Sequence, residues 1–188
     1  MRGVDDSLNI ITTILDELQA VCQNISEVEY EELVALLQED RTFYFAGEGR
    51  SGLVAKAIAM RLMHTGKEVF VIGETITPAI EKEDILIMLS GSGKTNQVIH
   101  LGEKAAECGA DVFLVTTNKK ALNYPWCTNG LYIPAATKYR LPEEPATIQP
   151  LGNQYDQSAH IILDAAIIDS LQVMNRHENM MDKHTNLE

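Results

Sequence analysis

Residues 43–52 read Phe-Tyr-Phe-Ala-Gly-Glu-Gly-Arg-Ser-Gly, a short apolar run that ends in glycines and leads into a helical segment. The same order recurs where the apolar run 85–89 is followed by Ser-Gly-Ser-Gly-Lys-Thr at residues 90–95. Glycine lets a backbone approach a ligand without a Cβ in the way, and the start of a helix presents unpaired N–H groups with a partial positive charge. Two such strand–turn–helix units predict an α/β protein that binds phosphate.

Five short apolar runs predict the strands of a sheet, at residues 43–46, 69–72, 85–89, 112–115 and 131–133. Each run is apolar throughout rather than alternating, which is typical of strands covered on both faces. Helical segments at 51–64 and 95–108 separate the strands, and a glycine follows each of them. We therefore expect a three-layer α/β/α sandwich built on a five-stranded parallel sheet.

Further helices are expected at both ends of the chain. Two N-terminal helices fall within residues 5–40: the second starts at the capping-box pair Ser26 and Glu29, and the first carries an apolar stripe, Leu8, Ile11, Leu15, Leu18 and Cys22. Residues 134–150 hold four prolines without apolar periodicity, which predicts a long and often functional surface loop. Pro150 is expected to open the last helix, and a polar tail occupies 175–188.

Composition limits the possible partners. The chain has 188 residues, of which 45% are apolar, so we expect one domain spanning 1–188. Its 15 basic and 27 acidic residues give a net charge of −12, the wrong sign for binding nucleic acid. The three cysteines, Cys22, Cys108 and Cys127, show neither zinc-site nor disulfide-framework spacing. With no signal peptide and no long apolar segment, we expect a soluble, cytoplasmic protein without a membrane partner.

The first glycine turn also fits the dinucleotide-binding pattern G-x-G-x-x-G, through Gly47, Gly49 and Gly52, and Glu74 lies about 20 residues further on. A nicotinamide oxidoreductase is therefore one alternative, and glycines that merely permit a tight turn are another. The second turn resembles a nucleotide-triphosphate loop, but Met88 stands where that pattern requires a glycine. What remains there is a hydroxyl-rich loop able to surround one phosphate monoester.

Several segments together resemble 6-phospho-3-hexuloisomerase, a family of sugar isomerase (SIS) domain proteins with a flavodoxin-like fold. They are the two glycine turns, Arg-Leu-Met-His at 61–64, Gly-Glu-Thr-Ile-Thr-Pro at 73–78, Gln-Pro-Leu-Gly at 149–152 and His-Thr-Asn-Leu-Glu at 184–188. The likeness covers nearly the whole chain in the same order.

This resemblance implies an enzyme that interconverts 6-phospho-3-hexulose and fructose 6-phosphate, in a pathway that fixes or releases formaldehyde through ribulose 5-phosphate. It implies no metal, no organic cofactor and a homo-oligomer, expected to be a tetramer with the first and last helices as interface candidates. The expected substrate-binding residues are Arg50, Ser51, Ser90, Gly91, Ser92, Gly93, Lys94 and Thr95. Among them, Ser51, Ser90, Ser92 and Thr95 are expected to hold the phosphate, with Arg50 or Lys94 assisting. Asp156 is the expected proton acceptor, and His184 is expected to open the sugar ring or shuttle a proton, in its own or a neighbouring subunit's site. A histidine in a disordered tail is the alternative interpretation of His184.

Three positions depart from the family pattern. Alanine is common where Glu48 stands, glutamate where Lys94 stands, and glutamate at the base position occupied by Asp156. The third departure touches the chemistry, because aspartate is one methylene shorter and a misplacement of about 1 Å can cost on the order of 100-fold in rate. A slower enzyme, an isomerase of another phosphosugar and a non-catalytic sugar-phosphate sensor therefore remain as alternatives.

Asp156 and its neighbours also allow less specific interpretations. An acid in the first turn of a helix is favoured by the helix dipole without any catalytic role. His160 lies four residues from both Asp156 and Asp164, which places the three side chains on one helix face. Without further ligands nearby, a solvated or interface stripe is a better interpretation of that face than a metal site.

Overall fold

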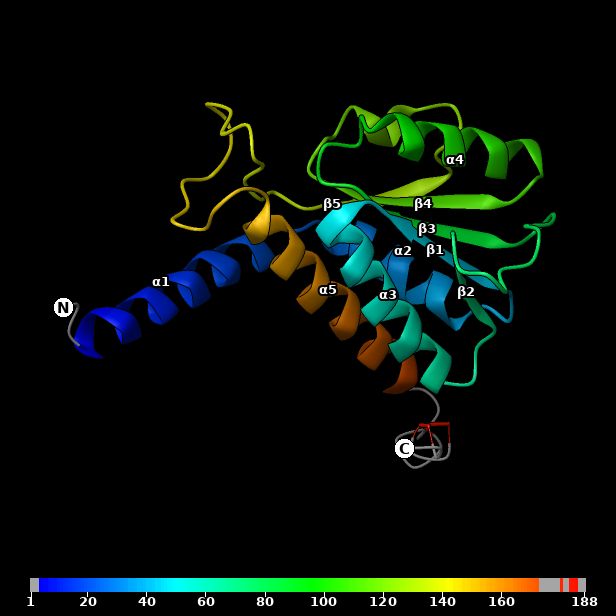
Figure 1. Cartoon of the computed structure of the whole chain (residues 1–188), viewed down its shortest axis with the longest axis horizontal. Helices are drawn as coiled ribbons and strands as arrows, with labels where there is room; N and C mark the ends of the chain where they lie inside the picture. Colours follow the sequence, from blue (N-terminus) through cyan, green and yellow to red (C-terminus); the bar gives the residue numbers. More distant parts are fainter. Residues whose placement is uncertain (1–3, 173–179, 181–182, 186–188) are drawn as a thin grey trace.

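A five-stranded parallel sheet forms the centre of the molecule (Figure 1). The computed structural model describes residues 4–172, 180 and 183–185. Within this part, the strands are β1 (Phe43–Gly47), β2 (Val69–Val71), β3 (Ile85–Leu89), β4 (Asp111–Thr116) and β5 (Asn129–Tyr132). They pair in the order β2-β1-β3-β4-β5, all parallel, which confirms the predicted sheet.

Helices cover both faces of this sheet, as Figure 1 shows. One face carries α2 (Glu27–Gln38), α3 (Gly49–His64) and α5 (Asn153–Gln172), and the other carries α4 (Asn96–Glu107) and the short 3-10 helix η1 (Ala121–Asn123). Successive strand residues alternate between two cores, so that Phe43 and Phe45 pack beneath α3 and α5 while Tyr44 packs on the α4 side. Every residue of β3 is buried, as its continuous apolar run predicts.

The remaining helix, α1 (Val4–Cys22), extends away from the sheet and packs only its end against the body (Figure 1). Leu18 and Val21 are buried there. The predicted apolar stripe is therefore only partly buried within this chain, because Ile11 and Leu15 are more than half exposed. Those two side chains lie beyond the point where α1 leaves the body.

Two predicted boundaries were wrong. The last helix begins at Asn153 rather than Pro150, because Leu151 adopts a positive φ of 53° and interrupts the helical path. Strand β5 begins at Asn129 and ends at Tyr132, whereas the apolar run predicted 131–133. Pairing with β4 determines this register, since Asn129 lies opposite Phe113.

The Ser26 and Glu29 pair forms half of the expected capping box. The Ser26 hydroxyl accepts a hydrogen bond from the Glu29 N–H at 3.3 Å, as predicted for a helix N-cap. The Glu29 carboxylate instead accepts the backbone N–H of Tyr132 at 2.8 Å. It thereby fastens α2 to the end of β5.

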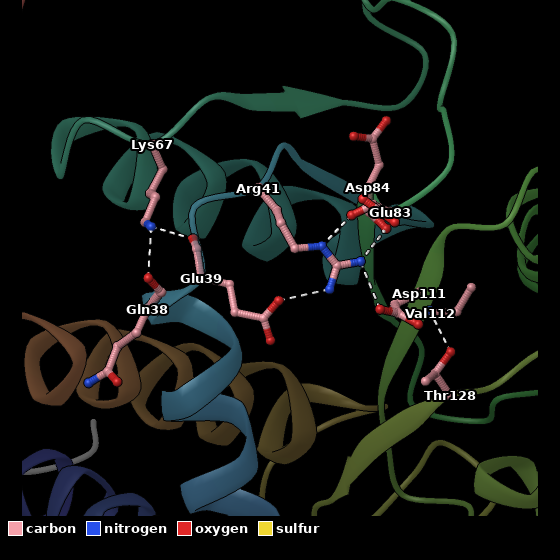
Figure 2. Close-up of polar contacts among 9 residues, drawn as sticks. All are labelled: Gln38, Glu39, Arg41, Lys67, Glu83, Asp84, Asp111, Val112 and Thr128. Carbon is pink, nitrogen blue, oxygen red and sulfur yellow. Dashed lines mark hydrogen bonds and ion pairs between the residues drawn. The ribbon is translucent and has the colours of Figure 1, made fainter.

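At the amino-terminal end of the sheet, Arg41 joins the segments that lead into three strands (Figure 2). Its guanidinium donates to the carbonyls of Glu83 and Asp84 ahead of β3, and to the carboxylates of Glu39 at 2.8 Å and Asp111 at 2.7 Å. Lys67 binds the carbonyls at the end of α2 in the same way. This end of the sheet is therefore closed by side chains that neutralise one another, and it leaves the opposite end for a ligand.

Replacing Arg41 with methionine should lower the free energy of unfolding by about 2 kcal/mol, because two carbonyls and two carboxylates lose a charged donor while the apolar stem is kept. Urea unfolding measures this loss. The matched control is Lys82→Met, whose ion pair with Glu83 spans 3.8 Å between largely exposed side chains and should not move the midpoint. Equal midpoints for the two variants would contradict the assigned role of Arg41.

Candidate active site

A cavity of about 370 Å³ lies at the carboxyl ends of β1 and β3. The chain leaves β1 for α3 on one face of the sheet and leaves β3 for α4 on the other, so the two loops diverge and leave a crevice between them. The following residues line it: Glu48, Gly49, Arg50, Ser51, Leu89, Ser90, Gly91, Ser92, Thr95, Thr137, Lys138, Tyr139, Leu151, Gly152, Tyr155 and Asp156.

The first loop is a tight connection between β1 and α3. A Cβ on Gly52 would lie 2.5 Å from the Gly47 carbonyl oxygen, so only glycine permits this approach. Gly49 has a positive φ of 57°, which glycine adopts without strain. Glu48 occupies the N-cap position of α3, yet its side chain makes no capping hydrogen bond. The start of α3 therefore offers unpaired backbone donors to the cavity.

The second loop, residues 90–95, is held rigidly around its own backbone. The Ser90 hydroxyl accepts the Gly93 N–H at 3.1 Å, and the Ser92 hydroxyl accepts the Lys94 N–H at 3.3 Å. Gly93 has a positive φ, and a Cβ there would lie 2.6 Å from the Cβ of Ala121. Thr95 is the N-cap of α4 without a side-chain capping bond. A second helix start with unpaired donors thus faces the same cavity.

Asp156 supplies a carboxylate to the cavity from the first turn of α5. Only 6% of the residue is exposed. Its Oδ1 accepts the Ser51 hydroxyl at 3.0 Å and its Oδ2 accepts Arg50 Nε at 3.2 Å, so both partners come from the first turn of α3. Arg50 also donates from Nη2 to Asn153 Oδ1 at 2.5 Å. The carboxylate is therefore held in a fixed orientation beside the second loop, residues 90–95.

Tyr155, which the sequence analysis did not single out, sets the distance between α5 and that loop. Its hydroxyl donates to the Val115 carbonyl at 2.7 Å, and its ring would lie 3.2 Å from a Cβ on Gly91. Burial raises the pKa of the Tyr155 phenol, and the nearby charge of Asp156 raises it further, so the hydroxyl stays protonated as a donor. In the sequence, only its position next to Asp156 indicated a role for Tyr155 in the site.

The loop at 134–150 does border the cavity, through Thr137, Lys138 and Tyr139. The Glu144 carboxylate fixes it by accepting the Thr137 N–H at 2.8 Å and the Thr137 hydroxyl at 2.6 Å. A second carboxylate, Glu17 of α1, accepts three hydrogen bonds from residues 147–149.

Burial alone would raise the pKa of Glu17, but the hydrogen bonds from Thr147, Gln149 and Ile148 outweigh it and hold the pKa below its ordinary value. The charged form is thus favoured by folding. The stabilisation that Glu17 provides is present above its ordinary pKa and is lost as the pH falls through the lowered value.

The structure brings together seven of the ten residues expected at the site: Arg50, Ser51, Ser90, Gly91, Ser92, Thr95 and Asp156. Gly93 shapes the second loop without lining the cavity. Lys94 lines a neighbouring hollow of about 360 Å³ instead. His184 lies elsewhere in this chain, because its ring stacks on His64 with centroids 5.2 Å apart at the far end of α3, roughly 20 Å along the helix from Ser51. Residues 186–188, which follow it, lie outside the described part.

Other candidate ligands are dispersed. His160 is exposed, and Asp164 pairs with Arg61 at 3.3 Å. Across residues 4–172, 180 and 183–185, no group of three or more histidine, cysteine or acidic side chains is placed to hold a metal ion. Glu74, required by the dinucleotide alternative, binds Lys56 at 2.5 Å and does not line the cavity. In the same described part, no helix combines the length and apolar character needed to span a membrane.

Comparison with known proteins identifies the family of this chain and several similar proteins. Residues 36–148 match the family model for the SIS domain. A 3-hexulose-6-phosphate isomerase of Bacillus subtilis is 33% identical over 179 residues, which cover 95% of this chain and 97% of that protein. An uncharacterized protein of Archaeoglobus fulgidus is 32% identical over 177 residues, covering 94% of this chain and 92% of the other.

Among solved structures, a hypothetical protein from Methanococcus jannaschii superimposes with a TM-score of 0.77 at 26% identity, covering 97% of this chain and 99% of that one. Its crystal structure is described as inferring a molecular function of 3-hexulose-6-phosphate isomerase.

Proposed function

We propose that this chain, which belongs to the SIS-domain family, is a phosphosugar isomerase that interconverts 6-phospho-3-hexulose and fructose 6-phosphate. The observation that carries the proposal is one cavity into which two uncapped helix starts and a buried carboxylate converge. The Bacillus subtilis relative, a 3-hexulose-6-phosphate isomerase, supports the choice of sugar.

The second loop is the proposed phosphate site. Ser90, Ser92 and Thr95 contribute hydroxyls, and the first turn of α4 contributes backbone N–H groups and the positive end of its dipole. Ser51 and Arg50 close the other side of the cavity. Lys94, pointing to the neighbouring hollow, acts at longer range.

Asp156 is the proposed base. It takes the proton from C2 of 6-phospho-3-hexulose, and the C–H electron pair becomes the C2–C3 double bond of a cis-enediolate while the C3 carbonyl oxygen gains the negative charge. Transfer of the hydroxyl proton from the oxygen on C2 to the oxygen on C3, and return of the proton to C3, leave the ketone at C2. Atoms and electrons balance without an added oxidant or reductant, and one carboxylate on one face serves both carbon centres.

A non-catalytic sugar-phosphate sensor is the second candidate. The observation in its favour is that Asp156, one methylene shorter than the family's glutamate, is engaged by both Ser51 and Arg50. In a sensor, the same cavity would bind the phosphosugar without proton transfer.

We also propose that the chain assembles as a homotetramer. Apolar side chains are exposed on α1, α3 and α5, including Ile10, Ile11, Leu15, Leu53, Met60, Ile161 and Ile168. An apolar surface spread over adjacent helices marks a contact site, and a closed symmetric assembly would cover it. In such an assembly the proposed role of His184 falls to a neighbouring subunit's cavity, because in its own chain it lies at the far end of α3.

Asp156→Asn should lower the turnover of 6-phospho-3-hexulose at least 100-fold with little change in KM, because the amide keeps the shape and the hydrogen-bonding oxygen but cannot take the proton. The assay forms the substrate in situ and detects fructose 6-phosphate. Asp156→Glu is the matched variant, and it should keep measurable activity if the family's longer side chain reaches the same carbon.

Two outcomes, from that assay together with thermal-shift measurements, decide against the proposal. An inert wild type that still gains thermal stability from fructose 6-phosphate indicates the sensor. A wild type stabilised by NAD but not by fructose 6-phosphate would revive the oxidoreductase alternative.

Leu15→Asp should reduce the assembly from roughly four times the 20.9 kDa chain mass to smaller species, because the charge would be buried in the proposed contact. Sedimentation velocity measures the mass. Ala20→Asp is the control, since it adds the same charge on an exposed position away from the apolar stripe of α1. A monomeric wild type, or equal dissociation of both variants, would refute the proposed interface.

A further inference from the structure

Glu17, in the part of α1 that packs against the body, is anchored by three donors from the long loop. Its Oε1 accepts the Ile148 N–H at 2.7 Å, and its Oε2 accepts the Thr147 hydroxyl at 2.5 Å and Gln149 Nε2 at 3.0 Å. The next residue, Leu18, is buried and fixes the helix beside it. Glu17 does not line the cavity, so nothing in the proposed reaction uses it directly.

The bond to Gln149 is the first link in a continuous chain that reaches the proposed base. Gln149 Oε1 accepts Asn153 Nδ2 at 2.8 Å, and Asn153 Oδ1 accepts Arg50 Nη2 at 2.5 Å. Arg50 Nε then donates to Asp156 Oδ2 at 3.2 Å. Gln149 is almost wholly buried, so its amide cannot exchange these partners for water.

The direction of this chain is dictated by charge. Carboxylates at both ends can only accept, and the guanidinium of Arg50 can only donate. Each amide must therefore present its oxygen toward Arg50 and its NH₂ toward Glu17, and turning over either amide would break two bonds at once. The Arg50 side chain is 62% exposed, and its bond to Asn153 links its orientation, and with it one of the two contacts of Asp156, to α1.

We propose that Glu17 is a positioning residue for Asp156, acting through Gln149, Asn153 and Arg50. The inference rests on the proposed function, because it gives the ordered carboxylate a catalytic use. It also couples the seating of α1, whose outer face is the proposed subunit contact, to the geometry of the cavity.

Two variants in the loop at 134–150 separate the positioning of Asp156 from the simple attachment of this loop to α1. Gln149→Met keeps the volume of the side chain but interrupts the chain of hydrogen bonds, while the bonds from Thr147 and Ile148 to Glu17 stay. Thr147→Val removes the bond from Thr147 to Glu17 and the acceptor of the Gln149 backbone N–H, and it leaves the side-chain links from Glu17 through Gln149 to Asp156 in place. Glu17→Gln removes the charged end itself, and Asp16→Asn removes an exposed charge one residue away.

Steady-state kinetics test the proposal. Glu17→Gln and Gln149→Met should each lower kcat about tenfold, because small displacements of a reacting group carry such losses, and KM should stay within about threefold since loop 90–95 is untouched. The double variant should be no slower than the slower single variant, because both break one chain. Thr147→Val and Asp16→Asn should stay within twofold of wild type. Multiplied losses in the double variant, or a Glu17→Gln enzyme as fast as wild type, would overturn the proposal.

A spectroscopic measurement keeps this test apart from the proposed function. In ¹H–¹⁵N spectra, Glu17→Gln and Gln149→Met should shift the Arg50 Nε–H and Asn153 side-chain signals, and Thr147→Val should not. A wild type without turnover overturns the isomerase, and these signals still decide whether Glu17 orders the groups around Asp156. Unchanged Arg50 and Asn153 signals in Glu17→Gln would contradict the proposed chain of hydrogen bonds, even in an active enzyme.

Discussion

The carboxyl ends of β1 and β3 lie side by side, and their following helices leave toward opposite faces of the sheet. The crevice, the two uncapped helix starts and the place where α5 docks all follow from this divergence. Gly47 and Gly52 make it possible on the β1 side, because a side chain at either would strike the backbone of the other's turn. On the β3 side, Gly91 leaves room for the ring of Tyr155. This ring places α5 and Asp156 against the second loop, residues 90–95.

This geometry explains how a chain of net charge −12 can be suited to an anion. The cavity offers hydroxyls and helix-start N–H groups instead of a basic surface, and such donors act only over a few ångströms. Arg50 is the cation nearest the base, and it is shared between Asp156 and Asn153. Selection of a small phosphate ester over a polyanion is what such an arrangement favours.

The sequence predicted those features whose physics is local. The run 85–89 is apolar because both faces of β3 are covered, the glycines at 47 and 93 mark turns that a Cβ would obstruct, and Gly49 has a positive φ of 57°. The sequence did not predict the features that depend on residues distant in the chain. Strand β5 begins at the polar Asn129 because β4 pairs with it, and Tyr155 matters because of a carbonyl forty residues away. The first helix was expected to be an interface candidate, and Ile11 and Leu15 on its stripe are more than half exposed in this chain. The SIS family and the five-stranded parallel sheet were predicted correctly; the catalytic assignments of Asp156 and His184 stay predictions.

Proton exchange tests the central claim, that a phosphosugar bound in this cavity gives up a proton to Asp156, most directly. Fructose 6-phosphate incubated with the protein in D₂O should gain deuterium at C3, the carbon that would be deprotonated in the reverse reaction, and not at C1. The exchange, followed by ¹H NMR, should vanish in Asp156→Asn. Exchange that persists unchanged in that variant, or an absence of exchange in a wild type shown to bind the sugar, would contradict the account.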